Sequence, residues 1–277
     1  MRGRKSVLSD NKYRDENSFS HRCNKTPLPA ARTAIAALAL AAAFSTPGSA
    51  GEPAYTPEFG ASVRAYLLDN PEVVLEVFRL LEGQERAKKT QAASASIAKV
   101  ADQLFQSDDA RKGRADAPVI AVEFFDYQCG YCKAALPELA QAMEGRDDVA
   151  VVLKEFPILG PASKRASRIA LAVRALHGDD AYLGFHNALL LQKGELNDAT
   201  LSMLAEAAGF DFDALSVRSN EADISATIAA NWRLAQTLSI NGTPAFVFED
   251  ELVGGMMNAE RLTQKFDLLA KAEKPNL

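Results

Sequence analysis

Long apolar runs are missing from this sequence of 277 residues. The longest, residues 34–44, is shorter than the roughly 20 residues that a helix needs to cross a bilayer. Cysteine and histidine are scarce, with 3 of each in the chain. Internal repeats and low-complexity segments are absent beyond the first fifty residues. The composition, 48% hydrophobic and 24% charged, is typical of a soluble globular protein with one large or two modest domains.

The first fifty residues have the three-part layout of a secretory signal peptide. Basic residues dominate the start, the apolar run follows, and Gly48 and Ala50 stand three residues and one residue before a cut at Gly51. A transmembrane anchor is the alternative, which the short apolar run disfavours. We therefore predict that residues 1–50 are removed and that the mature protein is periplasmic.

Removal of this segment changes both the charge and the cysteine count. Residues 1–50 hold 8 of the 31 Lys and Arg residues and 3 of the 36 Asp and Glu residues, so 23 basic and 33 acidic residues remain. The resulting net charge of −10 argues against nucleic acid or an anionic membrane as a partner. Cys23 leaves as well, which leaves only Cys129 and Cys132 in an oxidising compartment.

Residues 51–115 have a helical pattern that is too small to form a core of its own. The pairs Thr56-Pro57 and Asn70-Pro71 are typical helix starts. Apolar residues then recur at spacings of three and four, as in Val74, Phe78 and Leu81. They either pack on their own chain or, as we favour, lie between copies in an oligomerisation arm at residues 57–105, in a dimer or a trimer. The charged segment 107–118 is expected to link this region to the next domain.

The pattern changes after residue 116. Residues 119–127 are almost continuously apolar and rich in β-branched and aromatic side chains, which predicts a strand buried on both faces. A helix at about residues 129–143 and a second buried strand at 148–159 follow, and this order predicts parallel pairing. The rest of the chain predicts, in order, a long helical block, a β-hairpin at 245–255 and a final helix at about 258–272.

Cys129 and Cys132 lie between the first strand and its helix. A zinc site needs four ligands, and His177 and His186 lack a metal-ligand spacing. A structural disulfide would close too small a loop to constrain the unfolded chain. A redox pair is the best interpretation, because the N–H groups and dipole of a helix start stabilise a thiolate at Cys129. Cys132 could then resolve a mixed disulfide. We expect no metal and no cofactor beyond this redox-active disulfide.

Three stretches carry a resemblance to a known family. "FFDYQCGYCK" at residues 124–133 and "LKEFPILG" at 153–160 resemble DsbA-family proteins, nearest to ScsC-like and Com1-like exported oxidoreductases. "VRAYLLDNPEVVLEVFRLLE" at residues 63–82 resembles the N-terminal region of ScsC-like proteins, which oligomerises. The resemblance implies an α/β thioredoxin fold over residues 116–277, with a helical insertion at about 161–240, preceded by the helical arm.

The resemblance also assigns roles to further residues. Thr243 and Pro244 fall where this fold places a cis-proline loop that faces the cysteines and pairs with an extended substrate segment. An ordinary trans turn is the alternative. Glu123 falls where these folds bury an acid that would relay the proton of Cys132. Otherwise Glu123 is a structural carboxylate, and Lys154 is its expected partner.

The direction of electron flow depends on weaker features. Gly130 and Tyr131 between the cysteines, which are expected to contact substrate, resemble the dipeptide of DsbC-type isomerases, as does Thr243 before the proline. With an arm that joins several catalytic domains, they favour disulfide isomerisation or reduction in exported proteins with cysteines, reset by a membrane redox partner. A DsbA-like oxidase and a copper-handling protein that binds Cu(I) through both thiolates remain alternatives.

Overall fold

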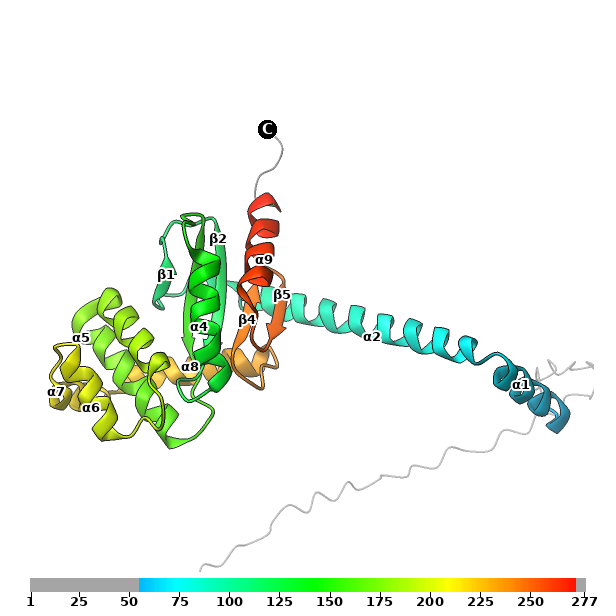
Figure 1. Cartoon of the computed structure of the whole chain (residues 1–277), viewed down its shortest axis with the longest axis horizontal. Coiled ribbons are helices and arrows are strands. Elements are labelled where there is room, and N and C mark those ends of the chain that lie inside the picture. Colours follow the sequence, from blue (N-terminus) through cyan, green and yellow to red (C-terminus); the bar gives the residue numbers. More distant parts are fainter. Residues whose placement is uncertain (1–54, 273–277) are drawn as a thin grey trace, which may run out of the picture. The chain divides into compact units, whose positions relative to one another are not determined.

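The computed structural model describes residues 55–272, so the predicted signal peptide lies outside the described residues. Residues 60–272 belong to one compact unit, which contains the sheet (Figure 1). The helices are α1 (Pro57–Asp69), α2 (Pro71–Lys99), α3 (Ala101–Phe105), α4 (Gly130–Met143), α5 (Pro161–Leu191), α6 (Asp198–Ala207), α7 (Phe212–Arg218), α8 (Ala222–Thr237) and α9 (Ala259–Ala272). The strands are β1 (Arg111–Gly113), β2 (Val119–Phe125), β3 (Val149–Glu155), β4 (Ala245–Phe248) and β5 (Glu251–Gly254).

The strands form a five-stranded sheet in the order β1-β3-β2-β4-β5. β2 and β3 pair in parallel, with Val119 opposite Val149 and Glu123 opposite Leu153, as the strand–helix–strand order predicts. All other neighbours are antiparallel, including the predicted β4–β5 hairpin. The expected α/β thioredoxin-type architecture is therefore confirmed.

The two faces of the sheet carry different cores, because successive side chains of a strand point to opposite sides. On β2, Ala121 and Phe125 join the core that contains the cysteines, while Val122 and Phe124 join the other core. Helices α4 and α9 contact each other over the first face, and α8 covers the second (Figure 1). Glu123 shares the parity of Ala121 and therefore faces the cysteine side.

The segment expected as a link, residues 107–118, instead contains strand β1, which pairs with β3. Gly113 permits this pairing, because its φ is 92° and an added Cβ would lie 2.3 Å from the Val149 carbonyl oxygen. Ile97 and Leu104, further upstream, are buried in the second core. The compact domain therefore begins well before residue 116, because the central strands need cover on an edge and a face.

The helical block at residues 161–240 comprises α5 to α8. Gly178, with φ 85°, breaks α5 into two helical parts. The side chain of Asn197 caps α6 by accepting the Thr200 N–H at 3.0 Å. Helix α7 has only seven residues, too few to give a clear helical period in the sequence.

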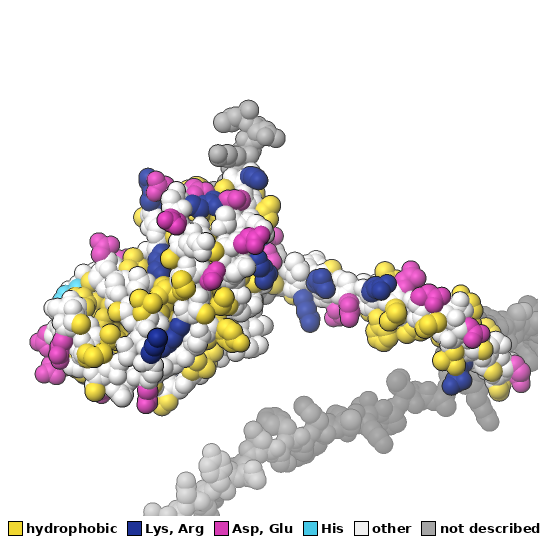
Figure 2. All heavy atoms as spheres, in the orientation of Figure 1, with side chains coloured by type: hydrophobic (Ala, Val, Ile, Leu, Met, Phe, Trp, Pro, Cys, Tyr) yellow, Lys and Arg dark blue, Asp and Glu magenta, His cyan; other side chains and the backbone are white. Residues whose placement is uncertain are grey.

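The apolar side chains of α1 and the first half of α2 are exposed in the single chain. Figure 2 shows them as yellow patches along these helices. Tyr66 is 59% exposed, Phe78 59% and Leu81 51%. By contrast, Ile97 near the end of α2 is 1% exposed. In the single chain, the apolar side chains of residues 63–81 therefore do not pack on their own domain. Within residues 55–272, no helix combines the length and apolarity needed to span a bilayer.

Candidate functional site

Cys129 lies where strand β2 passes into helix α4. It is the N-cap residue of α4, and its carbonyl accepts the N–H of Lys133 at 3.0 Å. Its own N–H donates to the carbonyl of Asp126 at 3.0 Å, which closes the turn after the strand. The free N–H groups of the first helical turn therefore surround the Cys129 side chain, where the helix dipole favours negative charge.

The pKa of the Cys129 thiol is lowered from 9.0 to about 5. The largest cause is a hydrogen bond from the Cys132 thiol, and smaller contributions come from the Thr243 side chain and from the backbone N–H groups of Cys132 and Tyr131. Partial burial opposes them. Cys129 keeps 7% of its surface exposed, and its lowered pKa makes it a thiolate at neutral pH.

Cys132 has the opposite environment. Its side chain is fully buried, and its pKa is raised, first by the hydrogen bond that it gives to Cys129 and then by burial. Both cysteines are free, so the structure contains the reduced pair. The neutral Cys132 thiol therefore donates a hydrogen bond to the Cys129 thiolate. Of the two, only Cys129 has the charged sulfur that can attack a disulfide.

The loop at Thr243 and Pro244 lies against the nucleophile. The peptide bond between these residues is cis, as the resemblance implies. In the thiol form, Cys129 Sγ donates to the Thr243 carbonyl oxygen at 3.1 Å. The Pro244 carbonyl accepts the N–H of Gly255 at 2.8 Å, which anchors the loop to the end of β5. A cavity of about 240 Å³ lies along this loop, lined by residues 239–245 and the end of β5.

Gly130 and Tyr131 form the exposed side of the cysteine turn. Tyr131 is 70% exposed, and a Cβ added at Gly130 would meet no atom within 4 Å. Neither residue is covered by neighbouring side chains, and both directly follow Cys129 in the chain. Their contact with substrate stays a prediction.

Glu123 is buried in the sheet on the cysteine side, with 4% of its surface exposed. Burial raises its pKa to about 7, and the positive charge of Lys112 acts in the opposite direction. The negative charge of Glu123 in turn helps to raise the pKa of Cys132. The charge of Glu123 therefore acts on the buried thiol, and its role as a proton relay stays a prediction.

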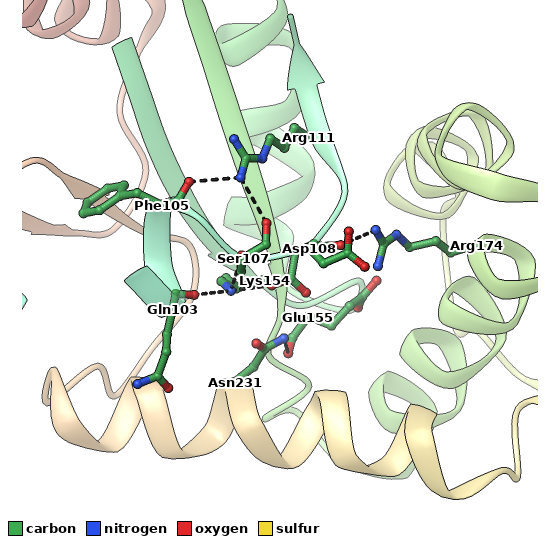
Figure 3. A network of polar contacts seen from close by, with 10 residues as sticks. Gln103, Phe105, Ser107, Asp108, Arg111, Lys154, Glu155, Arg174 and Asn231 are labelled. Atoms are coloured by element: carbon green, nitrogen blue, oxygen red, sulfur yellow. Dashed lines mark hydrogen bonds and ion pairs between the residues drawn. The ribbon is translucent and has the colours of Figure 1, made fainter. Parts of the chain in front are cut away.

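The predicted pairing of Glu123 with Lys154 is wrong. Lys154 stands opposite Phe124 in the β2–β3 register, so its side chain points to the other face of the sheet. There its Nζ donates to the Gln103 carbonyl at 2.8 Å and to Ser107 Oγ at 3.0 Å (Figure 3). It also forms an ion pair with Asp109.

The charge that faces Glu123 comes from Lys112 on β1. Sequence reasoning missed this residue, because a three-residue strand with two basic residues has no apolar pattern. The alternation of faces across a known β1–β3 pairing is the signal that could have found it.

A second buried carboxyl lies on the cysteine side. Glu155 Oε1 accepts hydrogen bonds from Tyr127 Oη at 2.7 Å and Tyr182 Oη at 2.8 Å, and burial raises its pKa to about 7. Tyr127 Oη also lies 3.2 Å from His186 Nδ1. His177, the other histidine of residues 55–272, stacks on a phenylalanine of the helical block. Among residues 55–272, no group of three or more His, Cys, Asp or Glu side chains could hold a metal ion.

Comparison with known proteins agrees with this architecture. Residues 120–267 match the family described as DSBA-like thioredoxin domain, and residues 56–88 match the copper resistance protein ScsC N-terminal domain. The chain spans 29% of the length of a curated relative, the Na(+)/H(+) antiporter NhaA 3 of Salinispora tropica, with 28% identity over 190 residues.

Solved structures align over nearly their whole length. A thioredoxin-like oxidoreductase from Silicibacter pomeroyi is 37% identical over 61% of this chain and 97% of its own, with a TM-score of 0.58. Proteus mirabilis ScsC in a compact conformation is 31% identical over 79% of this chain and 100% of its own, with a TM-score of 0.58. The thiol-disulfide exchange protein alpha-DsbA2 from Wolbachia pipientis is 31% identical over 66% and 98%, with a TM-score of 0.62. The chain therefore belongs to the DSBA-like thioredoxin domain family, and its N-terminal region is of the ScsC type.

Proposed function

We propose that this protein is an exported thiol:disulfide oxidoreductase that isomerises or reduces disulfides in other exported proteins. The observation that carries the proposal is the asymmetric pair at the start of α4. Cys129 has a pKa lowered to about 5 and keeps 7% of its surface exposed, while Cys132 is fully buried as a neutral thiol. This arrangement supplies one nucleophile and one resolving group.

The first step is attack of the Cys129 thiolate on a substrate disulfide. The substrate S–S bond breaks, a mixed disulfide forms at Cys129, and the released substrate sulfur leaves as a thiolate that takes a proton from solvent. The half-buried Thr243 supports this step, because its backbone lies beside the Cys129 sulfur, where an extended substrate segment can pair with it.

Two routes complete the cycle. In isomerisation, another thiolate of the substrate attacks the mixed disulfide, a new substrate disulfide forms, and Cys129 returns to its thiolate with no net electron transfer. In reduction, Cys132 loses its proton and attacks Cys129. The substrate leaves with two more electrons, and a Cys129–Cys132 disulfide forms that a membrane redox partner must reduce. Glu123, buried on the same side with a pKa raised to about 7, is the group that would accept the Cys132 proton.

Three features favour isomerisation over the DsbA-like oxidase, in which the disulfide passes from Cys129 and Cys132 to substrate. The dipeptide Gly130-Tyr131 and the residue Thr243 are two of them. The third is the exposed apolar surface of residues 63–81, which suits association of several chains and hence several cysteine pairs acting on one substrate. The basic and apolar segments before residue 51 support export to the periplasm.

The direction is tested by equilibrating the mature chain, residues 51–277, with glutathione and by measuring recovery of a protein with scrambled disulfides. We expect recovery that is lost in Cys129→Ser, and a redox potential that is not strongly oxidising. A strongly oxidising potential together with no recovery would establish the oxidase instead.

Association through the arm is tested by light scattering. Phe78→Glu places a charge on the exposed apolar surface of α2 and should give a monomer, whereas Leu268→Glu, a residue of α9 with 63% exposure, should leave the mass unchanged. A chain shortened to remove the arm should also be a monomer. It should begin near residue 91, because Ile97, Leu104 and β1 belong to the compact domain. A monomeric mature chain would remove the third argument for isomerisation.

Copper handling has one observation in its favour, the match to the N-terminal domain named for copper resistance. The matched segment, residues 56–88, contains no Cys, His or Met, so Cu(I) ligands would come from elsewhere in the chain, where Cys129 and Cys132 supply two soft thiolates. Tight stoichiometric binding by the reduced chain that disappears in Cys129→Ser would support this function.

A further inference from the structure

Asp126 lies between the turn that carries Cys129 and the loop that joins β3 to α5. It is the first residue after strand β2 and has no exposed surface. A carboxylate in such a place needs hydrogen-bond donors, because an unpartnered charge in the protein interior is strongly unfavourable. Its donors are main-chain N–H groups of the cysteine turn, residues 126–132, and of the loop between β3 and α5.

Three backbone N–H groups donate to the Asp126 carboxylate. Gln128 N–H reaches Oδ1 at 2.7 Å, and the N–H groups of Ile158 and Leu159 reach Oδ2 at 2.8 and 2.9 Å. Bonds from N–H groups to a carboxylate are about twice as strong as those between neutral partners. One side chain therefore joins the cysteine turn to the loop between β3 and α5.

The main chain of the same residue holds the cysteines directly. The Asp126 carbonyl accepts the Cys129 N–H at 3.0 Å, and an Asp126 backbone hydrogen bond acts on Cys132. Cys129 needs its extended N-cap conformation, φ −76° and ψ 116°, for the amides of the first helical turn to point at its sulfur. Through its hydrogen bond with the Cys129 N–H, Asp126 holds Cys129 in this extended conformation.

We infer that Asp126 is a positioning residue for the nucleophile, which holds Cys129 at the start of α4 by clamping the cysteine turn to the Ile158–Leu159 loop. It does not touch substrate, and it acts through Cys129. The role rests on the proposed use of Cys129 as a thiolate, but it concerns the shape of the turn and can be measured without any substrate.

The test uses the full mature chain with Asp126→Asn and reads the Cys129 pKa from the pH dependence of its alkylation rate. An asparagine can accept at only one side, and its NH₂ group then faces an N–H donor. Loss of aligned donors around a charged sulfur corresponds to about one pKa unit or more. We therefore expect the Cys129 pKa to rise by about that amount, with faster amide exchange at residues 158 and 159.

The sign of the change separates three roles. A positioning residue raises the Cys129 pKa when it is replaced. A residue that acts only through its negative charge would lower that pKa when neutralised, because removal of a nearby negative charge favours a thiolate. A residue that serves only stability would lower the melting temperature and leave the pKa unchanged. Either of the last two results overturns the inference.

Asp211→Asn is the matched control. Asp211 also accepts two backbone N–H groups, from Asp213 at 2.9 Å and Ala214 at 3.3 Å, but it caps the exposed start of α7. It should leave the Cys129 pKa unchanged. If Asp126→Asn does not fold, Asp126→Ser is read instead, since its hydroxyl can still accept from Gln128 while the two bonds to the other loop are lost. A raised pKa without any disulfide activity would refute the proposed function and leave the positioning role intact.

Discussion

Replacing Glu123 by glutamine should make the protein more stable at alkaline pH. Burial raises the pKa of Glu123 from 4.5 to about 7, so the folded chain binds this proton more tightly than the unfolded chain does. The resulting stabilisation is complete below about pH 4.5 and is lost as the pH rises through about 7. One pKa unit corresponds to about 1.4 kcal/mol, so the loss at Glu123 amounts to about 3 kcal/mol. Glutamine is neutral at every pH, so the variant does not lose this stability when the pH rises.

The measurement is urea unfolding of the reduced mature chain over this pH range, at one fixed protein concentration because oligomers gain stability with concentration. Wild type and Glu123→Gln should agree at low pH and diverge above about pH 5, with the variant more stable by up to about 3 kcal/mol. Glu155, whose pKa is raised to about 7 as well, keeps its own contribution in both proteins.

Glu144→Gln, which changes an exposed carboxyl after α4, is the matched control and should follow wild type. The reasoning is refuted if Glu123→Gln loses stability with pH as steeply as wild type does. It is also refuted if the variant is less stable than wild type near pH 8, where Glu123 would then be acting as a favourable buried charge.

Two further predictions concern the neighbours of the site. Lys112→Met removes the positive charge that opposes the rise, so the pKa of Glu123 should climb further above about 7 and the pH range of its stability loss should move up with it. An unchanged range would mean that Lys112 does not act on Glu123. Cys132→Ala should raise the Cys129 pKa from about 5 toward 9.0, and Thr243→Val should raise it less, because the hydrogen bond from Cys132 is the largest cause of the lowering. Alkylation rates against pH measure both, and the reverse order would contradict the assignment of causes.

The strong periodic patterns were enough to predict the centre of the fold. A buried run, a C-x-x-C motif and a helix in succession predicted the β2–α4–β3 unit, and the turn after Phe248 predicted the hairpin. These elements are recognisable because their own side chains decide their structure. The place of Cys129 at a helix start follows from the same local order.

The remaining features depend on segments that are distant in sequence. Strand β1 has only three residues, so its pairing with β3 is decided by the partner and not by its own pattern. The misassignment of Lys154 has the same origin, since a charged residue in a buried strand can be matched only when its face is known. The contacts of Asp126 with Ile158 and Leu159 span more than thirty residues, and no local spacing indicates them.

The adjacent charges on β3 also bear on how the chain selects its strand pairing during folding. All seven residues of β3 are buried, so apolar side chains on either face give no preference between neighbouring alignments. A shift by one residue would turn Lys154 toward the cysteine helix and Glu155 toward Asp109. Both ionisable groups would lose their partners in a dry interior, at a cost of several kcal/mol each. The two charges therefore discriminate against misaligned sheets, a task that the hydrophobic pattern of this strand cannot perform.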